Sequence, residues 1–183
     1  MNSNYSSLTN EKSITYTSNS NDFNERLRNI NFRRQLRRSA GPNLSGQNFR
    51  GADLIGENLR RAELSGTHFE GAFLQGANLT EADLEGTHLE GAHLTRAILK
   101  KADLSGAFLQ GANLTQANLT GADLSGANLE GAILTGAILT GAILTRANLT
   151  GAILTGVDLS TVILSDIQSQ QIAASSRQLA FAR

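Results

Sequence analysis

The sequence contains no cysteine and no tryptophan, and it has a single proline among its 183 residues. Without cysteine, the chain can form no disulfide, no thiolate metal site and no cysteine nucleophile. No apolar run approaches the length of about 18 residues that a membrane-spanning helix needs, and residues 1–20 lack the apolar core of a secretory signal. These absences predict a cytoplasmic protein that does not enter a membrane.

Charge and composition divide the chain into unlike regions, although the formal net charge is zero. Residues 1–20 are rich in Ser, Asn and Thr and lack apolar periodicity, which predicts a disordered leader. For residues 21–41 the sequence predicts a short basic helical cap. Asp22 and Glu25 have the spacing of a capping box at the start of a helix, and a Gly-Pro pair would end it. The arginines of this basic cap are Arg26, Arg28, Arg33, Arg34, Arg37 and Arg38. They could contact nucleic acid or an acidic partner, but a solvated cap beside an acidic body is the simpler interpretation.

The rest of the chain is dominated by a repeat with a period of five residues. An apolar residue occupies every fifth position from Leu44 to Leu164, with Ala the usual residue two places before it and Gly two places after it. An α-helix would spread such residues around its surface, and a flat strand would place them alternately on opposite faces. Short extended pieces with Ala and Leu inward, joined by bends at Gly, instead wind into a closed coil. Periodicity alone leaves open whether that coil has three sides or four.

A resemblance decides between these shapes. The units GADLS, GANLT, EADLE and GANLE match the A(D/N)LXX signature, so residues 42–166 resemble the pentapeptide-repeat family. The resemblance implies an all-β fold, a right-handed quadrilateral parallel β-helix of about six coils, with 20 residues per coil. The N-terminal helix and residues 167–183, a tail or cap, would cover the ends. Because Glu57 takes an inward place that is usually Ala, we expect it near the N-terminal end, reached by an arginine or water.

If residues 20 apart stack, one outward column carries four carboxylates. They belong to Glu63, Asp83, Asp103 and Asp123. Such a stripe could attract cations or imitate the backbone of a nucleic acid. Alternatively, each short polar side chain could bond to the backbone close to it, and this is the interpretation that we favour.

A second column brings His68 and His88 together, with Phe108 next in line and with Glu70 and Glu90 beside the histidines. Two imidazoles and two carboxylates within one coil step could ligate zinc. Exposed rings can also stack on one another without any metal. The sequence favours this simpler arrangement, so we expect no metal and no cofactor.

The C-terminal half places isoleucine at outward positions where earlier coils carry Asp or Asn. These residues are Ile133, Ile138, Ile143, Ile153 and Ile163. A clustered apolar surface suggests an interface, and a second copy of the chain is its simplest partner. The high β propensity of isoleucine is the alternative explanation.

No catalytic constellation is recognisable, because no Ser or Thr has a placed histidine base and a side-chain-filled coil offers no cleft. We therefore expect a non-enzymatic scaffold that binds an unknown protein partner through its flat faces.

The resemblance implies one alternative, a DNA-mimicking protein that protects or inhibits a type II topoisomerase such as gyrase. Residues 44–166 carry seven basic and thirteen acidic residues, a net charge of −6, and no loop interrupts the register. In its uninterrupted register, the chain resembles the small cyanobacterial regulatory members of the family more closely than the DNA mimics. Direct nucleic-acid binding by the rod is not expected.

Overall fold

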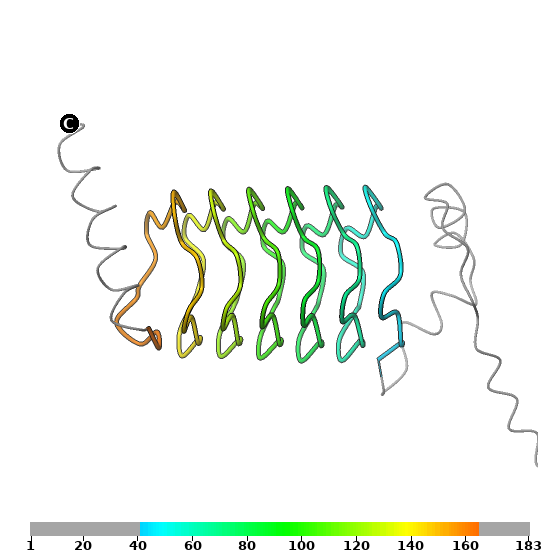
Figure 1. The fold of residues 1–183 in the computed structure, drawn as a ribbon, viewed down its shortest axis with the longest axis horizontal. Coiled ribbons are helices and arrows are strands. Elements are labelled where there is room, and N and C mark those ends of the chain that lie inside the picture. The colour runs from blue at the N-terminus through cyan, green and yellow to red at the C-terminus, as the bar shows by residue number, and fades with distance from the viewer. Residues whose placement is uncertain (1–40, 165–183) are drawn as a thin grey trace, which may run out of the picture.

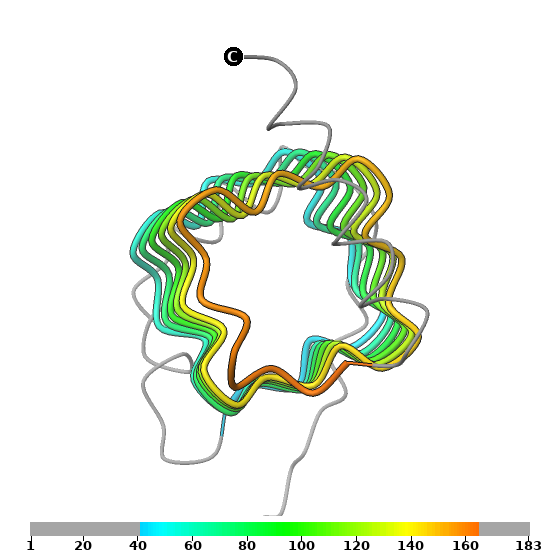
Figure 2. The same cartoon turned by 90° about the vertical axis from the view of Figure 1, so that its left-hand side faces the viewer.

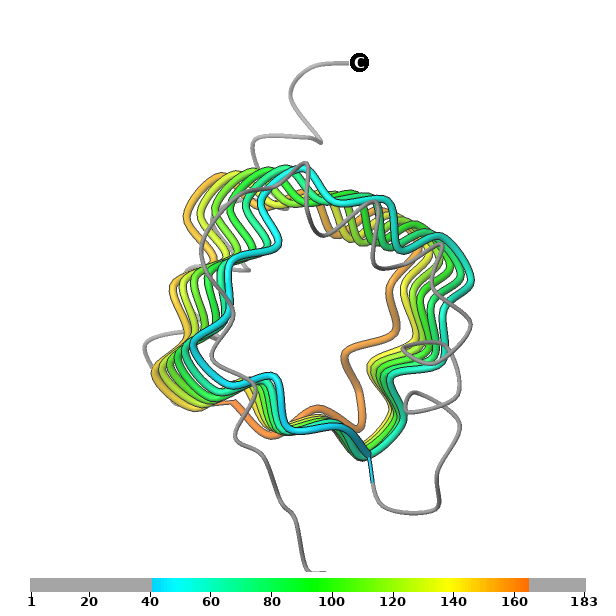
Figure 3. The same ribbon diagram turned by 90° about the vertical axis from the view of Figure 1, so that its right-hand side faces the viewer.

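The computed structural model describes residues 41–164, which wind into a rod of stacked coils (Figure 1). Seen from the C-terminal end (Figure 2) and from the N-terminal end (Figure 3), the coils follow one another around a single axis. Parallel bridges join residues 20 positions apart, such as Glu63 with Asp83 and Asp83 with Asp103. Each coil therefore contains 20 residues, and the fold is the right-handed quadrilateral β-helix that the family resemblance implies.

Each five-residue unit is a short extended piece followed by a turn. Within residues 41–164 no strand is longer than one bridge residue, and no helix occurs. The carbonyl of Leu44 accepts a hydrogen bond from Gln47 N at 3.1 Å, and Gly46, the third residue of this turn, has a φ of 66°. A positive φ at the third turn residue is the requirement of a type II turn, which explains why glycine is usual there.

Backbone hydrogen bonds run in both directions between successive coils. Leu64 N donates to Asp83 O at 2.8 Å, and Gly66 N donates to Glu85 O at 2.9 Å. In the other direction, Asp83 N donates to Ala62 O at 2.9 Å. A shift of register would break all such bonds between two coils at once, so the column to which each side chain belongs is strongly specified.

The inward Leu and Ala side chains fill the rod. From Leu54 to Leu134, no central Leu or Phe exposes more than 2% of its surface. Thr67 and Thr87 replace inward alanines and are fully buried. Their hydroxyls donate to Leu44 O at 3.0 Å and to Leu64 O at 2.9 Å. These buried hydroxyls therefore leave no donor unsatisfied.

The two ends of the rod are less regular than its middle. In the first coil Glu57 is partly exposed, as expected for a carboxylate at an inward place near the end. In the last coil Val157 and Val162 replace alanine, and Asp158 forms no bridge to Ile138 within the described part of the chain. Figure 2 shows part of this coil, in orange, running inside the outline of the others.

Several predicted segments lie outside the described residues. They are the leader at residues 1–20, the basic cap with its arginines from Arg26 to Arg38, and the tail at residues 167–183. Within residues 41–164, no helix exists that is long and apolar enough to span a membrane.

Four columns of outward bridge residues define four faces of the rod. Face 1 begins at Asn43, face 2 at Asn48, face 3 at Asp53 and face 4 at Asn58, and each continues in steps of 20 residues. Side chains that are distant in sequence are therefore neighbours along a face.

Candidate functional surfaces

The acidic column, defined as Glu63, Asp83, Asp103 and Asp123, lies on face 1 in successive coils. Three of its carboxylates accept a hydrogen bond from the amide two residues later. The pairs are Asp83 with Glu85 N at 3.1 Å, Asp103 with Ser105 N at 2.9 Å and Asp123 with Ser125 N at 2.8 Å. Ser65 Oγ also donates to the second carboxylate oxygen of Asp83 at 2.6 Å. Local bonding of this kind accounts for aspartate at these places.

Among residues 41–164, six residues other than glycine have a positive φ at the third turn position. They are Arg61, Glu81, Arg96, Lys101, Gln116 and Arg146. Two pairs of them, each one coil apart, are joined by side-chain hydrogen bonds. Arg61 Nε donates to Glu81 Oε2 at 2.5 Å, and Arg96 Nε donates to Gln116 Oε1 at 2.8 Å. Sequence reasoning missed these contacts, although long polar side chains at glycine places 20 residues apart are a readable signal.

Glu81, at the third position of its turn, is paired with two arginines of the preceding coil. Arg61 contacts it in a salt bridge at 2.5 Å, and Arg60 Nη2 lies 3.3 Å from its other carboxylate oxygen. The hydrogen bond from Arg61 is the main cause that lowers the pKa of Glu81, and the charges of both arginines act in the same direction.

An aromatic stack runs along face 2. The ring centroids of His68 and His88 are 4.6 Å apart, with 9° between the ring planes. Those of His88 and Phe108 are 4.7 Å apart, also at 9°. The stacking expected from the sequence is therefore present. On face 3, His93 stacks on Phe73 in the same way, with centroids 4.9 Å apart.

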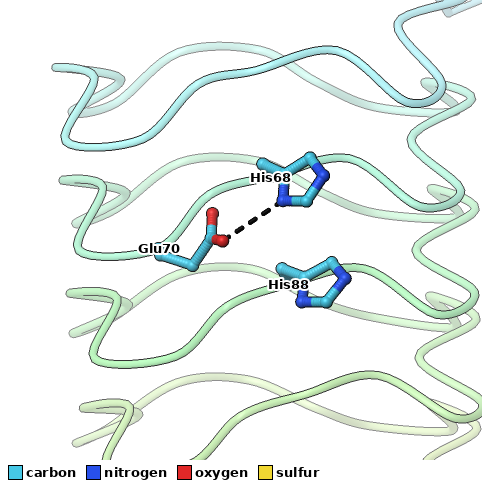
Figure 4. A group of neighbouring side chains, drawn as sticks. All are labelled: His68, Glu70 and His88. Atoms are coloured by element: carbon cyan, nitrogen blue, oxygen red, sulfur yellow. Dashed lines mark hydrogen bonds and ion pairs between the residues drawn. The ribbon is translucent and has the colours of Figure 1, made fainter.

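Each histidine of face 2 also contacts a carboxylate on its own coil. His68 Nδ1 lies 3.2 Å from Glu70 Oε1 (Figure 4), and His88 Nδ1 lies 3.1 Å from Glu90 Oε1. Arg50 Nη2, on the preceding coil, lies 3.5 Å from Glu70 Oε1. Burial opposes ionisation of Glu70, but its backbone hydrogen bond, the His68 contact and the Arg50 charge outweigh burial, so the pKa of Glu70 is lowered.

The five isoleucines of the C-terminal half do not share one face. Ile133 and Ile153 stack on face 3, Ile143 and Ile163 stack on face 1, and Ile138 lies on face 4. Three of them are exposed, Ile138 by 47%, Ile153 by 44% and Ile163 by 53%. The isoleucines therefore extend around three faces of the last coils, and any one flat partner can cover only part of them.

Comparison with solved structures finds several similar chains. The chain is similar to HetL, a pentapeptide repeat protein involved in heterocyst differentiation regulation from the cyanobacterium Nostoc sp. strain PCC 7120. The two are 27% identical over 70% of this chain and 89% of that chain, with a TM-score of 0.50. Rfr23, from the cyanobacterium Cyanothece 51142, is 32% identical over 69% of this chain and 90% of that chain, with a TM-score of 0.48. QnrB1, a plasmid-mediated fluoroquinolone resistance protein, is 21% identical over 72% of this chain and 86% of that chain, with a TM-score of 0.27.

Comparison with family models identifies the repeat itself. No curated protein matches the chain. The family model described as Pentapeptide repeats matches it in overlapping segments from residue 43 to residue 166. These segments cover more than half of the sequence and coincide with the coils of the rod. The chain therefore belongs to the pentapeptide repeat family.

Proposed function

We propose that the chain is a non-enzymatic protein-interaction scaffold, a rigid rod that binds a protein partner through its flat faces. The observation that carries this proposal is the filled interior, because the inward Leu and Ala side chains of the middle coils are buried against one another. The charged side chains of these coils lie outside, in columns with a spacing of about 4.8 Å. Such an array suits an extended or flat partner surface better than a small substrate, which needs a concave pocket.

A second copy of the chain, bound through the isoleucines, is the first partner that we propose. Face 4 separates the Ile133 and Ile153 pair on face 3 from the Ile143 and Ile163 pair on face 1. A flat interface between two rods can therefore bury one pair but not both. In each pair one isoleucine is exposed, Ile153 or Ile163, and the other is half-buried, so each pair supplies apolar area that is favourable to remove from water.

Light scattering on the full chain tests self-association. We expect a dimer for the wild type and a monomer for one of two double variants, Ile133→Asn with Ile153→Asn or Ile143→Asn with Ile163→Asn. Ile98→Asn is the matched control, because Ile98 is an exposed isoleucine at an equivalent outward place nearer the middle of the rod. A monomeric wild type contradicts self-association, and so does a dimer that survives both double variants.

Photo-crosslinking tests whether a protein partner, whatever its identity, binds through one defined face of the rod. A crosslinking residue placed at position 123, 128, 133 or 138 probes each of the four faces from a single coil. A partner bound through one face should be crosslinked from that face and weakly or not at all from the opposite one. Equal crosslinking from all four positions would contradict binding through a defined face.

Action on a type II topoisomerase is the second candidate, and the acidic column on face 1 is the observation behind it. Against it, three of these carboxylates bond to their own turns, and two of the three residues other than glycine at the turn just before the column, Arg61, Glu81 and Lys101, are basic. A gyrase supercoiling assay with micromolar protein, with and without a quinolone, separates the two candidates. Inhibition or protection of gyrase that is lost in the double variant Asp83→Asn with Asp103→Asn would support action on a topoisomerase. The absence of any effect of the wild type on gyrase would exclude this candidate.

A further inference from the structure

Two histidine–glutamate pairs lie directly above one another on face 2. His68 and Glu70 belong to one coil and His88 and Glu90 to the next, and a parallel bridge joins the two histidines. The ligand atoms that His68, Glu70 and His88 offer all lie within 4.8 Å of one another. In Figure 4 the two imidazoles are stacked, and Glu70 approaches the edge of the His68 ring from the side. Four groups that commonly bind metal ions are thus gathered on the surface of two coils.

The cluster has more lone pairs than donors. Glu70 Oε2 and Glu90 Oε2 are both buried, and neither has a hydrogen-bond partner within the described part of the chain. An ionised carboxylate can only accept hydrogen bonds, and a neutral imidazole brings one N–H donor. Arg50, the cation that contacts this cluster, reaches Glu70 Oε1 and is itself 62% exposed. A cation bound between the coils would offset the charge of two carboxylates that each keep one oxygen without a donor.

We propose that His68, Glu70, His88 and Glu90 form a binding site for a divalent transition-metal ion of the zinc class. Two imidazole nitrogens and two carboxylate oxygens form a donor set that zinc accepts in four-coordinate sites. The ion lies between the two coils and bridges them. Proposed in this way, the site is independent of the partner that the rod binds.

The distances require only a small movement. With ligands at about 2.1 Å, neighbouring ligand atoms of a tetrahedral zinc site are roughly 3.4 Å apart. The nitrogen-to-oxygen distances within the two pairs, 3.2 Å and 3.1 Å, are already close to this value. The ligand atoms of His68, Glu70 and His88, within 4.8 Å of one another, must approach by at most roughly 1.4 Å, and the rings must tilt out of their parallel stack. Glu90 would join the set through its contact with His88. The His68 and His88 side chains are 41% and 33% exposed, so the core does not hold them in place.

His93 provides a matched control within the same chain. It is the third of the three histidines in the sequence. It stacks on Phe73 much as His88 stacks on Phe108. Two residues after it, however, the chain has Thr95 where His68 and His88 are followed by glutamate. It therefore has the ring and the stack without the carboxylate.

Isothermal titration with zinc chloride tests the site on the full chain, purified without a polyhistidine tag. We expect one zinc ion per chain. Binding should be weaker in His68→Gln or His88→Gln by at least about 10- to 100-fold, the loss that removal of an outer-shell partner alone causes. His93→Gln should bind as the wild type does. Binding of no zinc at millimolar concentration would overturn the proposal, as would equal loss in His93→Gln or one-to-one binding that survives His68→Gln with His88→Gln.

Nuclear magnetic resonance of the three imidazoles gives a second readout that does not depend on affinity. Stoichiometric zinc should shift the nitrogen and proton signals of His68 and His88 and leave those of His93 in place. Glu70→Gln with Glu90→Gln keeps the shape of the cluster but removes both charges, so it should abolish these shifts. Shifts of all three histidines together would indicate non-specific binding and would also overturn the proposal.

Discussion

The backbone amide of Leu84 donates to the carbonyl of Asp103 at 2.6 Å, which places Leu84 next to Leu104 in the following coil. Both leucines are buried, with 0% and 1% of their surfaces exposed. Each coil therefore buries its leucines mainly against the coils on either side of it, as in other solenoids. The stability of the rod should depend on position along its axis, and this can be measured.

Leu84→Ala should destabilise the rod by about 2–5 kcal/mol, because it leaves a cavity that the neighbouring coils cannot fill. Leu159→Ala should cost clearly less, since Leu159 belongs to the last described coil and is only partly buried. Urea denaturation followed by circular dichroism would measure both. Equal losses at the two positions would show that the end coil is as well packed as the middle.

Lys101→Gly should stabilise the rod. Lys101 has a φ of 54°, which costs a residue with a side chain about 1–2 kcal/mol, whereas glycine loses only about 0.5–1 kcal/mol through its greater freedom in the unfolded chain. The difference is a net gain of at most about 1.5 kcal/mol.

Gly111→Ala is the matched reverse substitution for Lys101→Gly. Gly111 has a φ of 64°, and an added Cβ would meet nothing within 4 Å, so backbone strain is the only cost. Its urea midpoint should fall while that of Lys101→Gly rises. A fall in both variants would mean that the Lys101 side chain contributes more than its backbone strain costs.

Asp103 should be replaceable by Asn but not by Ala. Asp103→Ala removes the acceptor for Ser105 N and should cost about 0.5–1.5 kcal/mol. Asp103→Asn keeps an oxygen for this bond and removes the repulsion from Asp83 and Asp123 on either side. We therefore expect the Asn variant to match or exceed the wild type in thermal stability, most clearly at low salt. A destabilised Asn variant would instead indicate a role for the negative charge.

The contact between Arg61 and Glu81 should make stability depend on pH in the acidic range. The folded pKa of Glu81 lies below its ordinary value of 4.5, mainly because Arg61 donates to the carboxylate. The contact therefore stabilises the fold above that ordinary value, and its contribution is lost as the pH falls through the lowered folded pKa.

Glu81→Gln tests this dependence. The stability difference between wild type and Glu81→Gln should be present at neutral pH and shrink on acidification below about pH 4.5. Glu85→Gln, on the same coil, is a suitable control, because Glu85 makes no salt bridge among the described residues. A difference that does not change with pH would mean that Gln at this position perturbs the turn itself.

The columns of the rod could be predicted from the sequence because the period of five is never interrupted. Once four units form a coil, Asp83 must lie beside Asp103 and His68 beside His88, and the bridges confirm both pairs. The alternation of inward and outward places follows from extended backbone alone. The register placed Glu57 inward, and the cost of burying its charge led to the expectation that it lies near the end of the rod, where it is partly exposed.

Other features depend on side-chain geometry that periodicity does not reveal. The repeat predicts a turn at Arg61 and Glu81, but only the structure shows that these two side chains meet across coils. Similarly, the sequence places Glu70 near His68, whereas the structure shows contact through Nδ1 and an unpartnered oxygen. Valine replaces alanine before both Asp158 and Ile163, yet only Asp158 lacks its bridge, so this replacement alone does not predict the loss.

The 20-residue coil also governs how such a chain can change in length. Insertion of a 20-residue cassette after Thr120 would lengthen the rod and leave every existing column intact. Insertion of a single quintet would preserve the turns and the core but would rotate all later residues by a quarter turn. Asp123 would then leave the column of Asp83 and Asp103, and isoleucines would move to different sides. For this architecture, the smallest duplication that conserves a binding surface is four repeats.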